Sequence, residues 1–139
     1  MEEEEAAADD VMSAPSLSGR VVLVIEDHAD IRAFMVLVLR GLGARVLEAG
    51  DGQGGLRELA RGHPTVVLCD LMMPAMDGFE FARRVRQNRA YHHVLLIAVT
   101  AHDDPNFLDK TWTAGFHGHL VKPVTRDQLT SLARRIVGE

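Results

Sequence analysis

Short apolar segments alternate with helical patterns along most of the chain, and this alternation restricts the fold more than any other feature. The apolar runs at residues 21–25, 65–69 and 94–99 are rich in β-branched residues and have the length of strands buried on both faces. The first run is followed by apolar residues at helical spacing over 31–42, where glycines mark the end of the helix. The sequence therefore predicts strands that alternate with helices.

The rest of the chain repeats this alternation, with less pronounced apolar patterns. Further strands are expected at 45–49 and 119–121, and further helices at about 54–61, 79–85, 107–114 and 129–136. Strands joined by helical crossovers run parallel in a sheet that is covered on both faces. We expect an α/β fold, a doubly wound five-stranded parallel sheet with flanking helices.

The charge distribution separates the first residues from the rest of the chain. Of the 20 acidic residues, six lie in the first ten positions, so the other 14 nearly balance the 15 lysines and arginines. The acidic block and the Ser/Pro/Gly-containing stretch after it lack sustained apolar periodicity. We expect a disordered tail at 1–18 and one folded domain at 19–139, with no room for a second domain.

Composition also argues against several classes of binding partner and cellular location. The near-neutral body has no broad basic footprint for nucleic acid, and no apolar run reaches the roughly 18 residues needed to span a bilayer. The N-terminus lacks the pattern of a secretory signal. Cys69 is the only cysteine, which excludes an intrachain disulfide. We expect a cytoplasmic protein with no nucleic-acid and no membrane partner.

Polar residues follow the predicted strands at the edge of the sheet where doubly wound folds bind ligands. They are Glu26, Asp27, Asp70, Thr100 and Lys122. Any one of them could equally be an ordinary polar loop residue. Three acids at one place repel one another unless a cation neutralises them, and hard oxygen ligands suit Mg²⁺. The group as a whole therefore indicates a magnesium site.

The same residues supply what phosphoryl transfer requires. A carboxylate such as Asp70 can be the nucleophile. A metal on Asp27, the Lys122 ammonium and the Thr100 hydroxyl would offset charge on the phosphoryl oxygens. The sequence thus indicates phosphorylation of Asp70.

Four segments resemble the signature blocks of bacterial two-component response-regulator receiver domains. They are Val24-Ile-Glu-Asp-His28, Leu68-Cys-Asp-Leu-Met-Met-Pro-Ala-Met-Asp-Gly78, Val99-Thr-Ala101 and Val121-Lys-Pro123. The second block is highly specific, and all four occur in the family's order. The resemblance spans about residues 19–137 and implies a flavodoxin-like receiver fold, here of the stand-alone, single-domain type.

The resemblance implies roles for the metal ligands. Asp27 would bind Mg²⁺ directly and Glu26 mainly through water. Asp70 and the backbone carbonyl of Met72 would complete the protein ligands. Pro74 and Gly78, by contrast, have a plain structural role in shaping the loop after the third strand and the entry to the next helix.

It also implies roles at the phosphoryl group. Asp70 would be the phosphoacceptor, contacted after transfer by Thr100 and Lys122. Receivers tend to have a cis bond before the proline that follows this lysine, here Pro123. Three residues before the lysine, where receivers usually carry an aromatic switch residue, this chain has His119.

A candidate partner surface lies next to this switch position. Helical spacing puts Leu108 and Trp112 on one face. Aligned by Gly115, that face belongs to the surface that receivers use for partners, beside His119. Two interpretations stay open for Trp112, an exposed binding anchor or a core residue.

The resemblance implies a signalling switch rather than an enzyme that acts on outside substrates. It would accept a phosphoryl group from a histidine kinase or a histidine phosphotransfer protein and signal through a downstream target protein or by self-association. One alternative is an aspartyl-nucleophile phosphatase of similar fold, but these typically have a second Asp where this chain has Met72. A flavin or nucleotide binder is disfavoured because no phosphate-binding loop follows Ile25.

Overall fold

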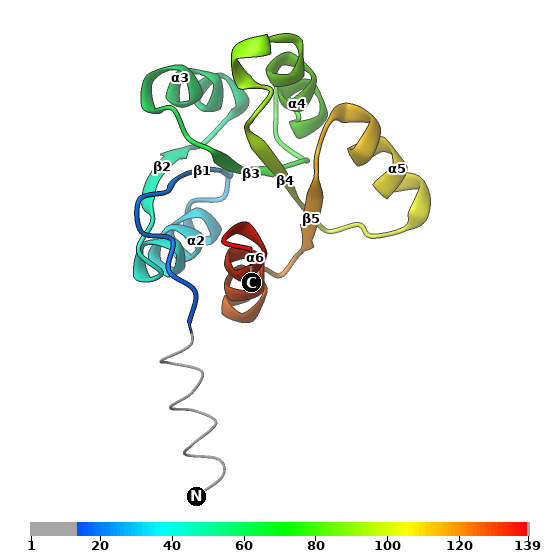
Figure 1. Ribbon diagram of the computed structural model, residues 1–139. Helices are drawn as coiled ribbons and strands as arrows, with labels where there is room; N and C mark the ends of the chain where they lie inside the picture. Colours follow the sequence, from blue (N-terminus) through cyan, green and yellow to red (C-terminus); the bar gives the residue numbers. More distant parts are fainter. Residues whose placement is uncertain (1–13, 139) are drawn as a thin grey trace, which may run out of the picture.

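A five-stranded parallel sheet forms the centre of the molecule (Figure 1). In this computed structural model, residues 14–138 are described. The strands are β1 (Val21–Ile25), β2 (Arg45–Ala49), β3 (Val66–Asp70), β4 (Leu95–Thr100) and β5 (Gly118–Val121). Their order in the sheet is β2-β1-β3-β4-β5, and every pair is parallel. The predicted doubly wound α/β fold is confirmed.

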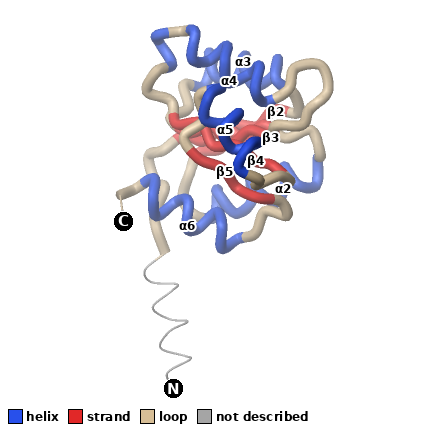
Figure 2. The backbone as a smooth tube through the Cα atoms, turned by 90° about the vertical axis from the view of Figure 1, so that its right-hand side faces the viewer, coloured by secondary structure: helices blue, strands red, loops and turns tan. Residues whose placement is uncertain are grey.

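Helices cover both faces of the sheet (Figure 2). They are α2 (Ala29–Gly41), α3 (Gly52–Gly62), α4 (Gly78–Gln87), α5 (Pro105–Ala114) and α6 (Arg126–Ile136), with a short 3₁₀ helix, η1 (Arg89–Tyr91), that the sequence did not predict. Two helices, α2 and α6, pack on one face, and α3, α4 and α5 pack on the other.

The alternation of side chains along the central strands divides the core into two layers. Val22 and Val24 of β1 point into the layer under α2 and α6. Leu23 and Ile25 of the same strand point into the layer under α3, α4 and α5. Since successive strand residues face opposite sides, an unbroken apolar run is what a strand covered on both faces requires.

The helix starts are fixed by short polar side chains, which satisfy backbone N–H groups of the first turn. Asp77 Oδ1 accepts a hydrogen bond from the Glu80 N–H at 2.9 Å and begins α4. Thr125 and Gln128 form a reciprocal capping box at the start of α6. Because α4 and α6 each follow a strand end, these caps also fix the loops at the carboxyl edge of the sheet.

The packed structure begins before the expected boundary at Gly19. Leu17 is fully buried in the core layer under α2 and α6, and its N–H donates to the Leu42 carbonyl at 2.7 Å. The rest of the tail expected over 1–18 falls largely on residues 1–13, which lie outside the described residues. Within residues 14–138, no helix has both the length and the apolar character needed to cross a membrane.

Candidate functional site

Three acids meet where the carboxyl ends of β1 and β3 lie side by side. Glu26 and Asp27 follow β1 directly, and Asp70 is the last residue of β3. One carboxylate oxygen from each lies within 4.8 Å of the other two. The structure therefore brings together the three acids that the sequence singled out.

The three acids differ in their exposure to solvent. Glu26 and Asp70 are buried, at 1% and 2% exposed, while Asp27 is exposed. Two buried carboxylates so close together are unfavourable without a compensating positive charge. The site is thus a group of three acids in which Asp27 alone is exposed to solvent.

Lys122, directly after β5, supplies part of the compensation. Its Nζ atom lies 3.1 Å from Glu26 Oε1 and 3.3 Å from Asp70 Oδ2. Burial lowers the pKa of Lys122, but the hydrogen bond to Glu26 and the charge of Asp70 outweigh this effect, so its pKa is raised. The ammonium group is therefore held in its charged form between two buried carboxylates.

Glu26 remains the least satisfied group of the site. Burial, followed by the nearby Asp70 carboxylate, raises the pKa of Glu26 to about 7 in spite of Lys122. Its Oε2 atom is buried and has no hydrogen-bond partner among the described residues. A buried carboxylate oxygen without a partner costs free energy, and a hard cation beside three carboxylates would relieve that cost. The residues present therefore fit a divalent cation.

The backbone after β3 fixes the orientation of Asp70. Its Oδ1 atom accepts a hydrogen bond from the Met72 N–H at 3.1 Å. The Met72 side chain is 62% exposed, so the residue contributes its backbone, not its thioether, to the interior of the site.

Thr100 ends β4 at the same edge and is buried. Its Oγ1 atom accepts from the His102 N–H at 3.0 Å, and its carbonyl accepts from the Lys122 N–H at 2.8 Å. The Lys122–Pro123 peptide bond is cis, the form implied by the resemblance. The hydrogen bond between Lys122 and Thr100 therefore links the ends of β4 and β5 beside Asp70.

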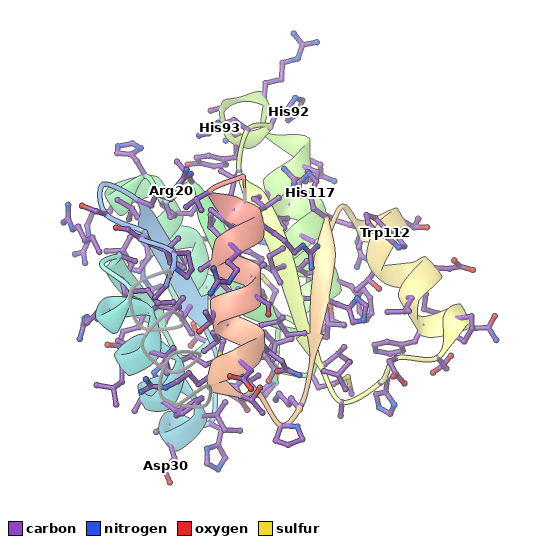
Figure 3. The ribbon with its side chains drawn as sticks, turned by 60° about the horizontal axis from the view of Figure 1, so that its bottom comes forward. Arg20, Asp30, His92, His93, Trp112 and His117 are labelled. Atoms are coloured by element: carbon purple, nitrogen blue, oxygen red, sulfur yellow. The ribbon has the colours of Figure 1, made fainter. Side chains whose placement is uncertain are left out.

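The residues expected at a partner surface lie together on another side of the molecule. Leu108 and Trp112 of α5 and His119 of β5 line one shallow hollow. Trp112 is 60% exposed and stands out from α5 (Figure 3). The inward side of the helix is occupied by Thr111 and Ala114. Of the two interpretations left open for Trp112, the structure supports the exposed one.

Two contacts beside the site have no signal in the sequence. Arg32 of α2 donates through Nη1 to the Glu26 carbonyl at 2.6 Å and through Nε to Glu48 Oε1 at 3.3 Å. The Phe107 ring lies 5.0 Å from the His102 ring and 5.6 Å from the Phe79 ring. Glu48 lies 16 residues from Arg32, and Phe79 is even more distant from Phe107, so no spacing rule reveals these contacts.

Comparison with known proteins agrees with this geometry. The family model described as "Response regulator receiver domain" matches residues 22–134. PilG of Pseudomonas aeruginosa is 30% identical over 111 residues, which are 80% of this chain and 82% of PilG. The sensor histidine kinase CheAY of Helicobacter pylori is 33% identical over 94% of this chain, although the matched part is only 16% of that kinase.

Solved structures show the same fold. The chemotaxis protein CheY4 of Vibrio cholerae is 29% identical with a TM-score of 0.80, over 84% of this chain and 98% of CheY4. The receiver domain of a sensor histidine kinase from Pseudomonas aeruginosa is 29% identical with a TM-score of 0.78, over 88% of this chain and 100% of that domain. That domain holds a magnesium ion coordinated in its active-site cleft.

Proposed function

The chain belongs to the response regulator receiver domain family, and we propose that it is a phosphorylation switch of a two-component or phosphorelay system with Asp70 as the phosphoacceptor. Members of the family are signalling switches rather than catalytic enzymes. The observation that supports the assignment of Asp70 is its position. Its carboxylate ends β3 within the acidic group, is buried, and lies 3.3 Å from the Lys122 ammonium nitrogen.

The proposed reaction is a displacement at phosphorus. An oxygen of Asp70 bonds to phosphorus while the phosphorus–nitrogen bond of a phosphohistidine donor breaks, and the imidazole nitrogen leaves with the bonding electron pair. The Met72 N–H holds the Asp70 carboxylate in one orientation during the attack. Lys122 then pairs with a phosphoryl oxygen, and the Thr100 hydroxyl donates to another.

Magnesium is the cofactor we propose for this chain. Asp27, Asp70 and the backbone carbonyl of Met72 would hold the ion directly, and Glu26 mainly through water. Bound Mg²⁺ supplies positive charge that offsets the charge of the acids and of the incoming phosphoryl group. The unpartnered Oε2 atom of Glu26 and the magnesium ion in the Pseudomonas homologue support this part of the proposal.

The partners follow from the family and from the exposed surface. Receivers pair with histidine kinases, and we propose a histidine kinase or a histidine phosphotransfer protein as the donor. The output would pass through the hollow of Leu108, Trp112 and His119 to a target protein or to a second copy of the chain. The cytoplasmic location and the lack of a nucleic-acid partner stay predictions.

A small phosphodonor tests the assignment of Asp70. With Mg²⁺ present, the chain should gain one phosphoryl group that is stable in acid and labile in base, as measured by intact mass. Asp70→Asn should not gain it, because an amide is not a competent nucleophile. Asp77→Asn is the matched control, since Asn still caps α4. Labelling of Asp70→Asn at an unchanged rate would overturn the proposal.

A further inference from the structure

A groove of about 710 Å³ lies between α2 and α6, on the face of the sheet away from the Trp112 hollow. Its α2 wall contains Leu37, a large apolar residue that is 68% exposed. Its α6 wall carries Arg126, Asp127 and Arg134. The groove therefore combines an apolar wall with a wall that has more positive than negative charge.

The chain itself leads into this groove. Leu17 is anchored by its burial and by its hydrogen bond to the Leu42 carbonyl at the end of α2. Three residues earlier, Ala14 lines the groove. Figure 1 shows the described chain starting just below α2 and α6, at the bottom of the view. Residues 1–13 are thus attached at the groove.

The composition of residues 1–13 complements the walls of the groove. The segment has six acids, at 2–5, 9 and 10, and no lysine or arginine. Its other residues include the apolar or small set Ala6, Ala7, Ala8, Val11 and Met12. Its length is also sufficient. Thirteen residues span about 20 Å even as a helix, whereas the 11 residues of α6 span about 16 Å.

We propose that the acidic segment of residues 1–13 docks in the α2–α6 groove of its own molecule, with its acids beside Arg126 and Arg134 and its apolar residues over Leu37. Attachment at Ala14 raises the local concentration of the segment to the millimolar range typical of short tethers, so weak attraction suffices for substantial occupancy. Asp127 opposes the docking, but six acids face two arginines and one aspartate. The docked segment covers Leu37, so another protein must displace it to reach this side of α2.

Paramagnetic broadening in the full chain tests the docking. A nitroxide on Glu5→Cys reports on the segment, because Cys69 is fully buried and does not compete for the label. We expect broadening of the amide signals of Leu37 and Thr130. We also expect most of it to be lost when the five acids that remain in the labelled segment are changed to Gln and Asn, or in high salt, which screens exposed charges. Arg126→Gln with Arg134→Gln should have the same effect, and Arg57→Gln on α3 should have none.

Two results would overturn the proposal. One is broadening that stays confined to residues 14–20 or persists unchanged after neutralisation of the acids. Because that neutralisation leaves the packed domain untouched, this arm holds even if the arginine variants fail to fold. The other comes from a mixture in which one chain carries the nitroxide and a different, unlabelled chain carries ¹⁵N. If the broadening in this mixture equals the broadening seen when both labels are on one chain, the segment docks on a second copy.

Discussion

The Lys122 ammonium lies 3.1 Å from Oε1 of Glu26, while the other oxygen of the same carboxylate has no partner among the described residues. Lys122 is therefore already paired with the buried acids before any phosphoryl group binds. A metal ion and the Lys122 ammonium would interact with the same buried carboxylates. Each cation therefore weakens the binding of the other to these acids.

Lys122→Ala should separate metal binding from switching. We expect Mg²⁺ affinity to stay the same or to rise by up to about tenfold, because a cation beside the acids is gone. Phosphorylation or its structural consequence should fail, since no ammonium is left to pair with the phosphoryl oxygens. Calorimetric titration with Mg²⁺ measures the first effect, and Lys110→Ala on exposed α5 is the control. Loss of metal binding in a folded Lys122→Ala protein would contradict the prediction.

The two acids after β1 should contribute unequally to the metal site. Asp27 is exposed to solvent, whereas Glu26 is buried and already paired with Lys122. We expect Glu26→Gln to weaken Mg²⁺ binding by about tenfold, which is typical for the loss of a group that contacts the metal through water. Asp27→Asn should weaken Mg²⁺ binding more, because it removes a direct ligand. Titration of both variants under one set of conditions gives the order. The reverse order would exchange the roles of the two acids.

Much of the site could be predicted because a parallel sheet makes its strand ends converge. Once strands end at Ile25, Asp70 and Thr100, the polar residues at those ends must share one edge. Leu17 falls within the tail expected from the sequence, because a single apolar residue among Ser, Pro and Gly has no periodicity, and only the end of α2 shows what buries it.

The orientation of α5 marks another limit of the sequence. A helix with few apolar residues does not show which side faces inward, and here Thr111 is buried while Trp112 is exposed. Thr111 can take the inward position because its hydroxyl donates to the carbonyls of Phe107 and Leu108 within the helix. Nothing in the spacing of Leu108 and Trp112 reveals this.

His117 should make the stability of the domain depend on pH. Its Nδ1 atom accepts from the Leu96 N–H at 3.2 Å and lies 3.2 Å from Nη2 of Arg86. Burial and the charge of Arg86 lower the pKa of His117 below its usual 6.5. The folded chain then binds fewer protons than the unfolded chain between the two pKa values, so this contribution to stability is present above pH 6.5 and is lost as the pH falls below it.

Urea unfolding at pH 7.5 and about pH 5.5 measures this effect, which should be small because His117 is exposed to solvent. In His117→Asn the amide oxygen can still accept from Leu96, and we expect a weaker loss of stability on acidification than in the unmodified chain. Exposed His93→Asn is the control and should keep the original pH dependence. An identical pH dependence in His117→Asn would rule out this histidine as its source.

Trp112 should report phosphorylation and contribute to binding without supporting the fold. It is the only tryptophan, so its fluorescence comes from one place. Thr100 is bonded to the His102 N–H, and the His102 ring lies 5.0 Å from Phe107 of α5. Movement of Thr100 toward a phosphoryl group therefore disturbs the start of the helix that carries Trp112, and a beryllofluoride mimic should shift its emission.

The same residue gives a clear stability contrast. Because Trp112 is 60% exposed, Trp112→Ala should lower the free energy of unfolding by less than about 1 kcal/mol, whereas Phe81→Ala in the core should lower it by about 3–5 kcal/mol. Trp112→Ala should also weaken binding to the target or self-association by about 2 kcal/mol or more, as loss of an aromatic anchor does. Denaturant titration and a binding isotherm measure the two effects. A stable Trp112→Ala protein that binds the target and associates like the unmodified chain would exclude Trp112 from the output surface.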